Sequence, residues 1–327
     1  MDILYFFKYY FYTMLEIRNL NVILENINKR FYILRDISFS LEKKEILGLV
    51  GESGSGKTIL GKTILGLIKS PLRKISGEIY FKEEKINEEN IKNIRGKKIS
   101  MIFQNPTASL NPVFTIENQL IETIKNSARG ITYSEAKERA VNLLKKVEID
   151  NPLHRLKNYP HNLSGGMNQR VMIALALASN PEILIADEPT TALDVTVQAN
   201  IINLLKMLNS DMGLSIIFIT HDLSLIKKIA DRVAVIYAGE IVEVIEKDRL
   251  IAEKFRHPYS MLLNKCIPGL HSREEKLTTI PGEITQNTEE YENKCIFYER
   301  CPVKIEICRN KKPVFKSGCK CFNPVSQ

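Results

Sequence analysis

A glycine-rich loop carries the clearest chemistry in this sequence. Residues 51–58 read Gly-Glu-Ser-Gly-Ser-Gly-Lys-Thr and follow the apolar run 46–50. The spacing G-x-x-x-x-G-K-T predicts a strand, a loop and a helix whose backbone N–H groups bind phosphate oxygens. Lys57 is expected to reach the β- and γ-phosphates of ATP, and Thr58 to bind Mg²⁺. The expected nucleotide contacts are Gly51, Glu52, Ser53, Gly54, Ser55, Gly56, Lys57 and Thr58.

A carboxylate pair follows a second apolar run. Residues 183–186 are apolar, and Asp187 and Glu188 come directly after them. This pattern is typical of a buried parallel strand that ends at a ligand site. Asp187 is expected to hold Mg²⁺ through water, and Glu188 to act as the general base that polarises the attacking water.

Two more apolar runs end in polar residues. Residues 99–103 lead to Gln104, which we expect to bind Mg²⁺ or the attacking water. Residues 214–220 lead to His221, for which we expect a contact to the γ-phosphate. Because ligands bind at the carboxyl ends of the strands in open α/β sheets, these residues are expected at the same edge.

A second anion site is predicted at residues 163–170, which read LSGGMNQR. Ser164, Gly165 and Gly166 open an alanine-rich helical stretch, where a serine and bare backbone amides can bind an anion. One chain can bring two phosphate sites to the same ATP only by dimerising. No arginine finger is evident, and the SGG helix could supply its charge stabilisation.

Taken together, these motifs resemble the ATPase subunits of ABC transporters. In that family each ATP lies between the phosphate loop of one subunit and the SGG helix of the other. The resemblance implies one half-site made of Lys57, Thr58, Gln104, Asp187, Glu188 and His221, completed by the partner's Ser164, Gly165 and Gly166. Phe31 or Tyr32 would stack on the adenine, although either could equally be a core residue.

Further features resemble one branch of that family, the D-type ATPases of dipeptide, oligopeptide and nickel importers. They are Met167 after SGG, the run DEPTTALDVTVQA, the His257-Pro258-Tyr259 triplet and a cysteine-rich end. The resemblance implies a heterodimer with an F-type ATPase, although a homodimer stays open. It also implies two membrane-spanning permease subunits, an extracytoplasmic binding protein as an indirect partner, and a peripheral position on the cytoplasmic face of the cell membrane.

The expected fold is an α/β P-loop nucleotide-binding domain of the ABC type with an antiparallel β part. It would span residues 14–254, with a helical subdomain inserted at about 105–172. Residues 255–327 would form a small cysteine-rich extension. Within the subdomain, Thr132-x-x-Glu135 predicts a capping box at the start of a helix.

The bulk composition adds little about partners. The net charge is +8, but the basic residues occur as scattered pairs, which indicates a solvated surface rather than a nucleic-acid site. No apolar stretch reaches the ~20 residues of a spanning helix. We interpret residues 1–13 as an extension that need not be native, with a membrane-surface anchor as the alternative.

Five of the six cysteines lie in the last 33 residues. A protein that uses cytosolic ATP keeps its thiols reduced, which disfavours disulfides. The spacing lacks the close pairs of zinc sites and suits an iron–sulfur cluster. Importers of this branch carry a [4Fe-4S] cluster here, which implies Cys295, Cys301, Cys308 and Cys321 as ligands, with Cys319 as an alternative. Zinc, or thiols without metal, remain open.

We expect an ATPase that powers import of di- or oligopeptides, or of nickel chelates, with ATP, Mg²⁺ and the cluster as cofactors. The cluster would be a structural staple. The alternatives are a soluble ABC ATPase acting on ribosomes or DNA, and an ATPase regulated by the cluster. The soluble class usually has two cassettes or a long coiled coil, and this sequence shows one cassette and no such insertion.

Overall fold

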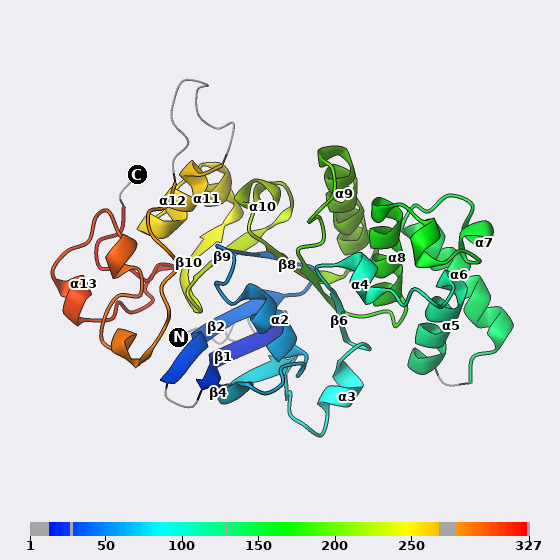
Figure 1. Ribbon diagram of the computed structural model, residues 1–327, viewed down its shortest axis with the longest axis horizontal. Helices are drawn as coiled ribbons and strands as arrows, with labels where there is room; N and C mark the ends of the chain where they lie inside the picture. The colour runs from blue at the N-terminus through cyan, green and yellow to red at the C-terminus, as the bar shows by residue number, and fades with distance from the viewer. Residues whose placement is uncertain (1–12, 27–28, 129, 268–278, 326–327) are drawn as a thin grey trace, which may run out of the picture. The chain divides into compact units, whose positions relative to one another are not determined.

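The computed structural model describes residues 13–26, 29–128, 130–267 and 279–325. The predicted extension of residues 1–13 lies outside these ranges except for Thr13. The chain divides into two compact units, Met1–Asn87 with Phe218–Gln327, and Glu88–Ile217. Figure 1 labels the elements of both.

The first unit contains an antiparallel sheet in the order β2-β1-β4-β5. Its strands are β1 (Thr13–Asn26), β2 (Lys29–Glu42), β4 (Leu72–Phe81) and β5 (Glu84–Lys85). Leu15 of β1 is fully buried and pairs with Leu41 on one side and Phe81 on the other. Alternate side chains of a strand share one face, so β1 buries its apolar residues against the unit's interior.

A second sheet in the first unit forms around a fully buried strand. Its strands in this unit are β3 (Ile46–Val50), the end of β8 (Ser215–Thr220), β9 (Arg232–Tyr237) and β10 (Glu240–Glu246). β3 lies between β9 and β8, and it pairs with β9 in parallel, with Leu47 opposite Arg232. β10 pairs with β9 in the antiparallel sense. The apolar composition of β3 fits a strand covered on both faces.

Helices of this unit pack against these strands. The phosphate loop leads into α2 (Lys57–Ile64), and α10 (Leu223–Ile229) packs on β3. Gly48 permits the close approach of α10, because a Cβ there would lie 2.7 Å from Cδ1 of Ile226. A side chain at this position would therefore displace α10 from the sheet.

The C-terminal part of the first unit has short helices and little strand. They are α11 (Lys247–Ile251), α12 (Pro258–Lys265), η2 (Glu289–Tyr291), η3 (Tyr298–Arg300) and α13 (Ile307–Asn310). Polar contacts tie this extension to β10: buried Glu240 accepts hydrogen bonds from Lys312 at 2.7 Å and Lys320 at 2.6 Å. Glu243 also forms an isolated β-bridge with Cys319. These contacts compensate for the scarcity of apolar residues in the tail.

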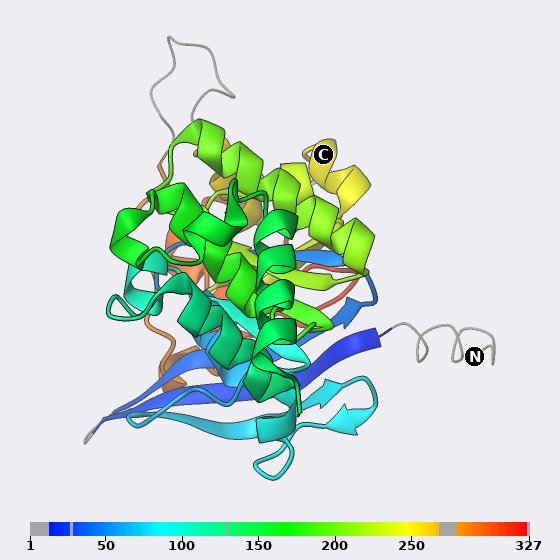
Figure 2. The same ribbon diagram turned by 90° about the vertical axis from the view of Figure 1, so that its right-hand side faces the viewer.

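The second unit is mainly helical and includes two paired strands. Its elements are α3 (Ile91–Ile94), β6 (Ile99–Ile102), α4 (Pro106–Ser109), α5 (Ile116–Ser127), α6 (Tyr133–Lys146), α7 (Pro152–Arg155), η1 (Pro160–Asn162), α8 (Gly165–Leu177), β7 (Ile183–Asp187), α9 (Val195–Met212) and the start of β8. β6 and β7 pair in parallel, with Ile99 opposite Ile183. Figure 2 brings the helices of this unit toward the viewer.

Helix α8 is the centre of the helical packing, because α4, α5, α6 and β6 all contact it. Helix α6 begins as the sequence predicts. The backbone N–H of Thr132 donates to the Glu135 carboxylate at 2.8 Å, and the N–H of Glu135 donates to Thr132 Oγ1 at 3.3 Å. This reciprocal pair confirms the capping box. None of the helices in the described part of the chain has the length and apolar character that crossing a bilayer requires.

Candidate functional site

The phosphate loop lies between β3 and α2, which confirms the predicted strand–loop–helix order. Gly56 has φ +102°, and Gly51 approaches β9 so closely that a Cβ would lie 2.1 Å from the carbonyl oxygen of Ile236. Both positions therefore require glycine. A hydrogen bond from Gly239 N–H to the carbonyl of Ser55, at 2.9 Å, fixes the middle of the loop.

Lys57 turns back over this loop and is only 5% exposed. Its ammonium donates at 2.8 Å to the carbonyl oxygens of both Gly51 and Glu52. The lysine charge is thereby held over the loop's own backbone, at the N-terminal end of α2. A positive charge and a helix N-terminus at one place make an anion site.

Glu52 has two further partners that the sequence analysis did not identify. Its backbone N–H donates to the hydroxyl of Tyr259 at 2.9 Å. Its carboxylate accepts two hydrogen bonds from Arg300, each 3.0 Å long. Both partners come from the C-terminal extension, more than 200 residues away in sequence, and no local pattern indicates such a contact.

His221 follows the last residue of β8 in the first unit and is exposed. The next residue, Asp222, starts helix α10, where its carboxylate accepts a hydrogen bond from Ser224 N–H at 2.7 Å. This N-cap fixes the turn that presents His221 at the carboxyl end of a strand, the predicted position.

The carboxylate pair lies in the second unit. Asp187 ends β7 and is 1% exposed. Glu188 follows with φ +46°, a left-handed conformation that is uncommon for a residue other than glycine. Its carboxylate accepts hydrogen bonds from Gln104 Nε2 at 2.9 Å and from Thr191 Oγ1 at 2.8 Å. The structure therefore brings the predicted pair Gln104 and Glu188 together and adds Thr191.

Ser164 is the N-cap of helix α8, and its hydroxyl accepts a hydrogen bond from the N–H of Met167 at 3.3 Å. Ser164 and Gly165 are exposed, so the first turn of the helix faces outward. Gly166 must remain small because a Cβ would lie 2.9 Å from Cγ1 of Val197. Backbone amides at the start of a 13-residue helix are a favourable place for an anion, and the second anion site stays a prediction.

Four of the clustered cysteines influence one another. Burial raises the pKa of Cys295 to about 12, and the nearby thiols of Cys308, Cys321 and Cys301 add to the rise. The N–H of Cys295 also donates to the carbonyl of Cys308 at 2.9 Å. These are the four predicted ligands. Even so, within the described ranges no group of three or more His, Cys, Asp or Glu side chains is arranged to hold a metal ion.

Cys319 has a different environment from the other four. It is buried in an isolated bridge to Glu243, and burial followed by that carboxylate raises the pKa of Cys319 to about 12. The thiol of Cys321 also raises the pKa of Cys319. The environment favours Cys321 over Cys319 as a member of the four-thiol group.

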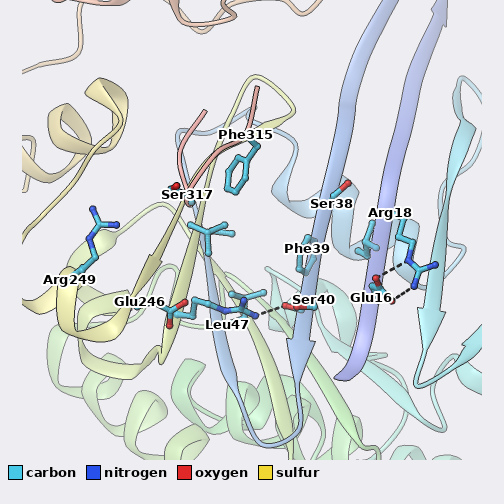
Figure 3. A pocket seen from close by; sticks show the side chains of 15 residues that line it. Glu16, Arg18, Ser38, Phe39, Ser40, Leu47, Glu246, Arg249, Phe315 and Ser317 are labelled. Carbon is cyan, nitrogen blue, oxygen red and sulfur yellow. Dashed lines mark hydrogen bonds and ion pairs between the residues drawn. The ribbon is translucent and has the colours of Figure 1, made fainter. Parts of the chain in front are cut away.

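A cavity of about 520 Å³ in the first unit is a separate feature (Figure 3). None of its lining residues belongs to the loop 51–58. Arg18 is paired with Glu16, and Arg232 with Glu45, and the figure shows the first of these pairs at one side of the cavity. These two guanidinium groups are already paired, and a third lining arginine, Arg249, lies 3.8 Å from the carboxylate of Glu243.

Comparisons with known proteins agree with these motifs. Residues 34–191 match the family described as "ABC transporter", and residues 242–308 match "Oligopeptide/dipeptide transporter, C-terminal region". The dipeptide transport ATP-binding protein DppD of Escherichia coli is 40% identical over 304 residues, which cover 92% of each chain. The oligopeptide transport ATP-binding protein OppD of Bacillus subtilis is 46% identical over 274 residues, covering 82% of this chain and 76% of that one.

Two more similarities extend this picture. A probable peptide ABC transporter ATP-binding protein, y4tR, of Sinorhizobium fredii is 42% identical over 306 residues, covering 92% of this chain and 90% of that one. Among solved structures, the dimeric ATP-binding cassette MJ0796, in a post-hydrolysis state bound to ADP and Pi, aligns with a TM-score of 0.64. It is 30% identical, and the alignment covers 72% of this chain and 99% of that chain.

Proposed function

Because relatives at 40–46% identity cover most of its length, the chain belongs to the ABC transporter ATP-binding family, and we propose that it hydrolyses ATP to power peptide import. The α/β P-loop fold predicted from the sequence is confirmed by this membership. The match of residues 242–308 to a peptide-transporter region favours an importer over a soluble ABC ATPase of ribosomes or DNA. The relatives' names concern peptides, so the proposal commits to peptides rather than nickel chelates.

In the proposed site, residues 51–58 bind the phosphates. Thr58 and Gln104 would bind Mg²⁺ directly, and Asp187 would bind it through water. The order of the motifs in the family supports this assignment. Glu188 acts as the general base toward water, and His221 contacts the γ-phosphate. When bound, Mg²⁺ would neutralise charge developing on the phosphate oxygens.

We assign the SGG helix to the neighbouring ATP site of a dimer. Ser164, Gly165 and Gly166 would contact the γ-phosphate bound to a partner subunit, because helix N-termini stabilise negative charge. The related cassette MJ0796 is dimeric in its ADP-and-Pi state, which supports a dimer here. The importer branch suggests an F-type ATPase as the partner.

We propose that the second unit docks on permease subunits. Five large apolar side chains on it are more than 45% exposed, namely Val113, Phe114, Tyr133, Leu153 and Val195. Covering such side chains with a protein partner removes apolar surface from water, which is favourable. We therefore propose a peripheral position on the cytoplasmic face of the membrane, in contact with two permease subunits.

The observation that carries the ATPase assignment is the hydrogen-bonded position of Glu188. Gln104 and Thr191 both donate to one oxygen of its carboxylate, which orients the group at the end of a buried strand. A positioned carboxylate is what general-base catalysis requires, and such a base contributes about 10²–10⁴-fold to the rate.

Phosphate release from Mg·ATP tests this assignment. Glu188→Gln keeps the shape and removes the base, so we expect turnover to fall by about 10²–10⁴-fold while ATP stays bound. Glu182→Gln is the matched control, since Glu182 precedes the same strand and pairs with Lys98 at 3.2 Å. Full turnover in Glu188→Gln would refute the assignment of Glu188 as the general base.

We further propose that Cys295, Cys301, Cys308 and Cys321 hold a [4Fe-4S] cluster as a structural staple. The mutual influence of the four thiols on the pKa of Cys295 and the chemistry of a four-thiolate donor set support it. A cluster would add folding energy to a segment with few apolar residues. The absence of a metal-holding arrangement among the described residues gives it no support.

Anaerobically purified protein tests the cluster directly. Iron, sulfide and zinc are measured on the sample whose visible spectrum is recorded. About four irons per chain with a broad absorption band is the expected result for a four-thiolate cluster. Zinc, or no metal at all, would refute the cluster and leave the ATPase assignment intact. Cys319→Ser is the matched control and should retain the iron content.

A further inference from the structure

Glu52 is the second residue of the phosphate loop, a position at which the G-x-x-x-x-G-K-T pattern accepts any side chain. In this protein all three of its polar groups are engaged. The N–H donates to Tyr259, the carbonyl accepts from Lys57, and the carboxylate accepts from Arg300. Glu52 therefore links the P-loop lysine to the C-terminal extension.

Arg300 is itself firmly held. Its side chain is 5% exposed, and its Nε donates to the carbonyl of Pro281 at 2.7 Å. The guanidinium carbon lies 5.6 Å from the ring centre of Tyr237 on strand β9. Its two terminal nitrogens also approach the hydroxyl of Tyr237 and the carbonyl of Ile280, and each donates one N–H to Glu52. An arginine held in this way meets the carboxylate in a defined direction.

Tyr259 is equally constrained. It is fully buried in the first turn of helix α12, and its ring centre lies 4.7 Å from that of Tyr237 and 5.4 Å from that of Phe297. The cap of α12 is the imidazole of His257, which accepts the N–H of Tyr259 at 3.1 Å. The hydroxyl that meets Glu52 is therefore placed by a packed aromatic group rather than by a mobile side chain.

We propose that Tyr259 and Arg300 are positioning residues that hold the phosphate loop ready for ATP, so that nucleotide affinity depends on the C-terminal extension. This inference rests on the proposed ATPase function. Lys57 bonds to the carbonyl of Glu52, so any shift of Glu52 moves the oxygen that orients the lysine. A loop that must be reordered on binding lowers affinity by the cost of ordering it.

The proposal predicts which kinetic constant changes. Both positioning residues act on the phosphate loop rather than on the proposed base Glu188, so the chemical step should be spared. A contact that stabilises bound ATP and the transition state equally raises KM when it is lost and leaves kcat unchanged. A charge-assisted double hydrogen bond that is largely buried corresponds to a change of about tenfold in affinity.

Steady-state ATPase kinetics and equilibrium binding of a fluorescent ATP analogue test it on the full chain. Arg300→Gln should raise KM for ATP about tenfold, with kcat changed less than about twofold. Arg300→Lys keeps the charge but loses the paired geometry and should rescue only part of the affinity. Tyr259→Phe removes a single hydroxyl and should raise KM by a smaller factor.

The matched control is Arg309→Gln, an exposed arginine beside Cys308 just as Arg300 lies beside Cys301. It should leave KM and kcat at wild-type values. The double variant Glu52→Gln with Arg300→Gln should bind ATP no more weakly than the worse single variant, because the two act through one contact.

Wild-type KM in folded Arg300→Gln and Tyr259→Phe would overturn the proposal. If Arg300→Gln fails to fold, Arg300→Lys and Tyr259→Phe decide by the same comparison. Equal changes in KM for Arg309→Gln would also contradict it, since that would indicate general damage to the extension. A wild-type chain without ATPase activity would instead refute the proposed function.

Discussion

The most informative stability prediction concerns Glu240, which joins the C-terminal extension to strand β10. Its side chain is 1% exposed, and it lies 2.6 Å from Lys320 Nζ and 2.7 Å from Lys312 Nζ. Burial alone would raise the pKa of Glu240, but the two lysines outweigh burial and hold it below its usual value. Glu240→Gln would leave two ammonium groups close together without their carboxylate.

The magnitude follows from burial. Removing one partner of a buried ion pair costs about 3–5 kcal/mol. Lys320 is 8% exposed and Lys312 is 21% exposed, so water relieves part of the repulsion. We therefore expect the unfolding free energy of Glu240→Gln to fall by about 3 kcal/mol, at the lower end of that range.

Urea unfolding followed by circular dichroism measures this loss. Glu16→Gln is the control, because Glu16 and Arg18 form a pair in which both side chains are more than a third exposed. Exposed pairs contribute under about 1 kcal/mol. Equal losses in the two variants would refute the argument that burial makes the Glu240 contacts strong.

Two other predictions follow from single contacts. Burial lowers the pKa of His257 from 6.5 to about 3. Between these two pH values the imidazole is protonated in the unfolded chain and neutral in the folded chain. Stability is thus full above pH 6.5 and falls by about 1.4 kcal/mol per pH unit below it. His257→Asn keeps an N-cap residue, so its urea midpoint should change less between pH 7 and pH 5 than that of the wild type. Equal changes of the midpoint with pH in the two proteins would contradict this. Thr132→Ala should cost about 1 kcal/mol by thermal unfolding, and Ser134→Ala on the same helix much less; equal losses would exclude the capping box as the cause.

The strands and their ends could be predicted from the sequence because the physics there is local. Buried parallel strands are apolar throughout, and polar residues follow where the strand ends. Ile183–Asp187 is such a strand, and Asp187 lies at its end as expected. The capping box at Thr132 is likewise encoded within four residues. Such signals do not depend on the rest of the fold.

The contacts of Glu52 and Glu188 show where sequence reasoning stops. Arg300 reaches Glu52 from 248 residues away, and no periodicity or spacing encodes that meeting. Thr191 lies only three residues from Glu188, but its hydrogen bond depends on the left-handed backbone at Glu188. The spacing of the cysteines and the family resemblance predict the set of four thiols. The separate environment of Cys319 depends on its bridge to β10, which the spacing does not indicate.

Phosphate release from Mg·ATP by the purified wild-type chain and by Lys57→Ala, measured side by side, tests the central claim most directly. Lys57 is held over the phosphate loop by Gly51 and Glu52, and its replacement removes the charge expected at the β- and γ-phosphates. The account predicts saturable release by the wild type and almost none by the variant. Equal release by the two proteins, or none by the wild type, would contradict it.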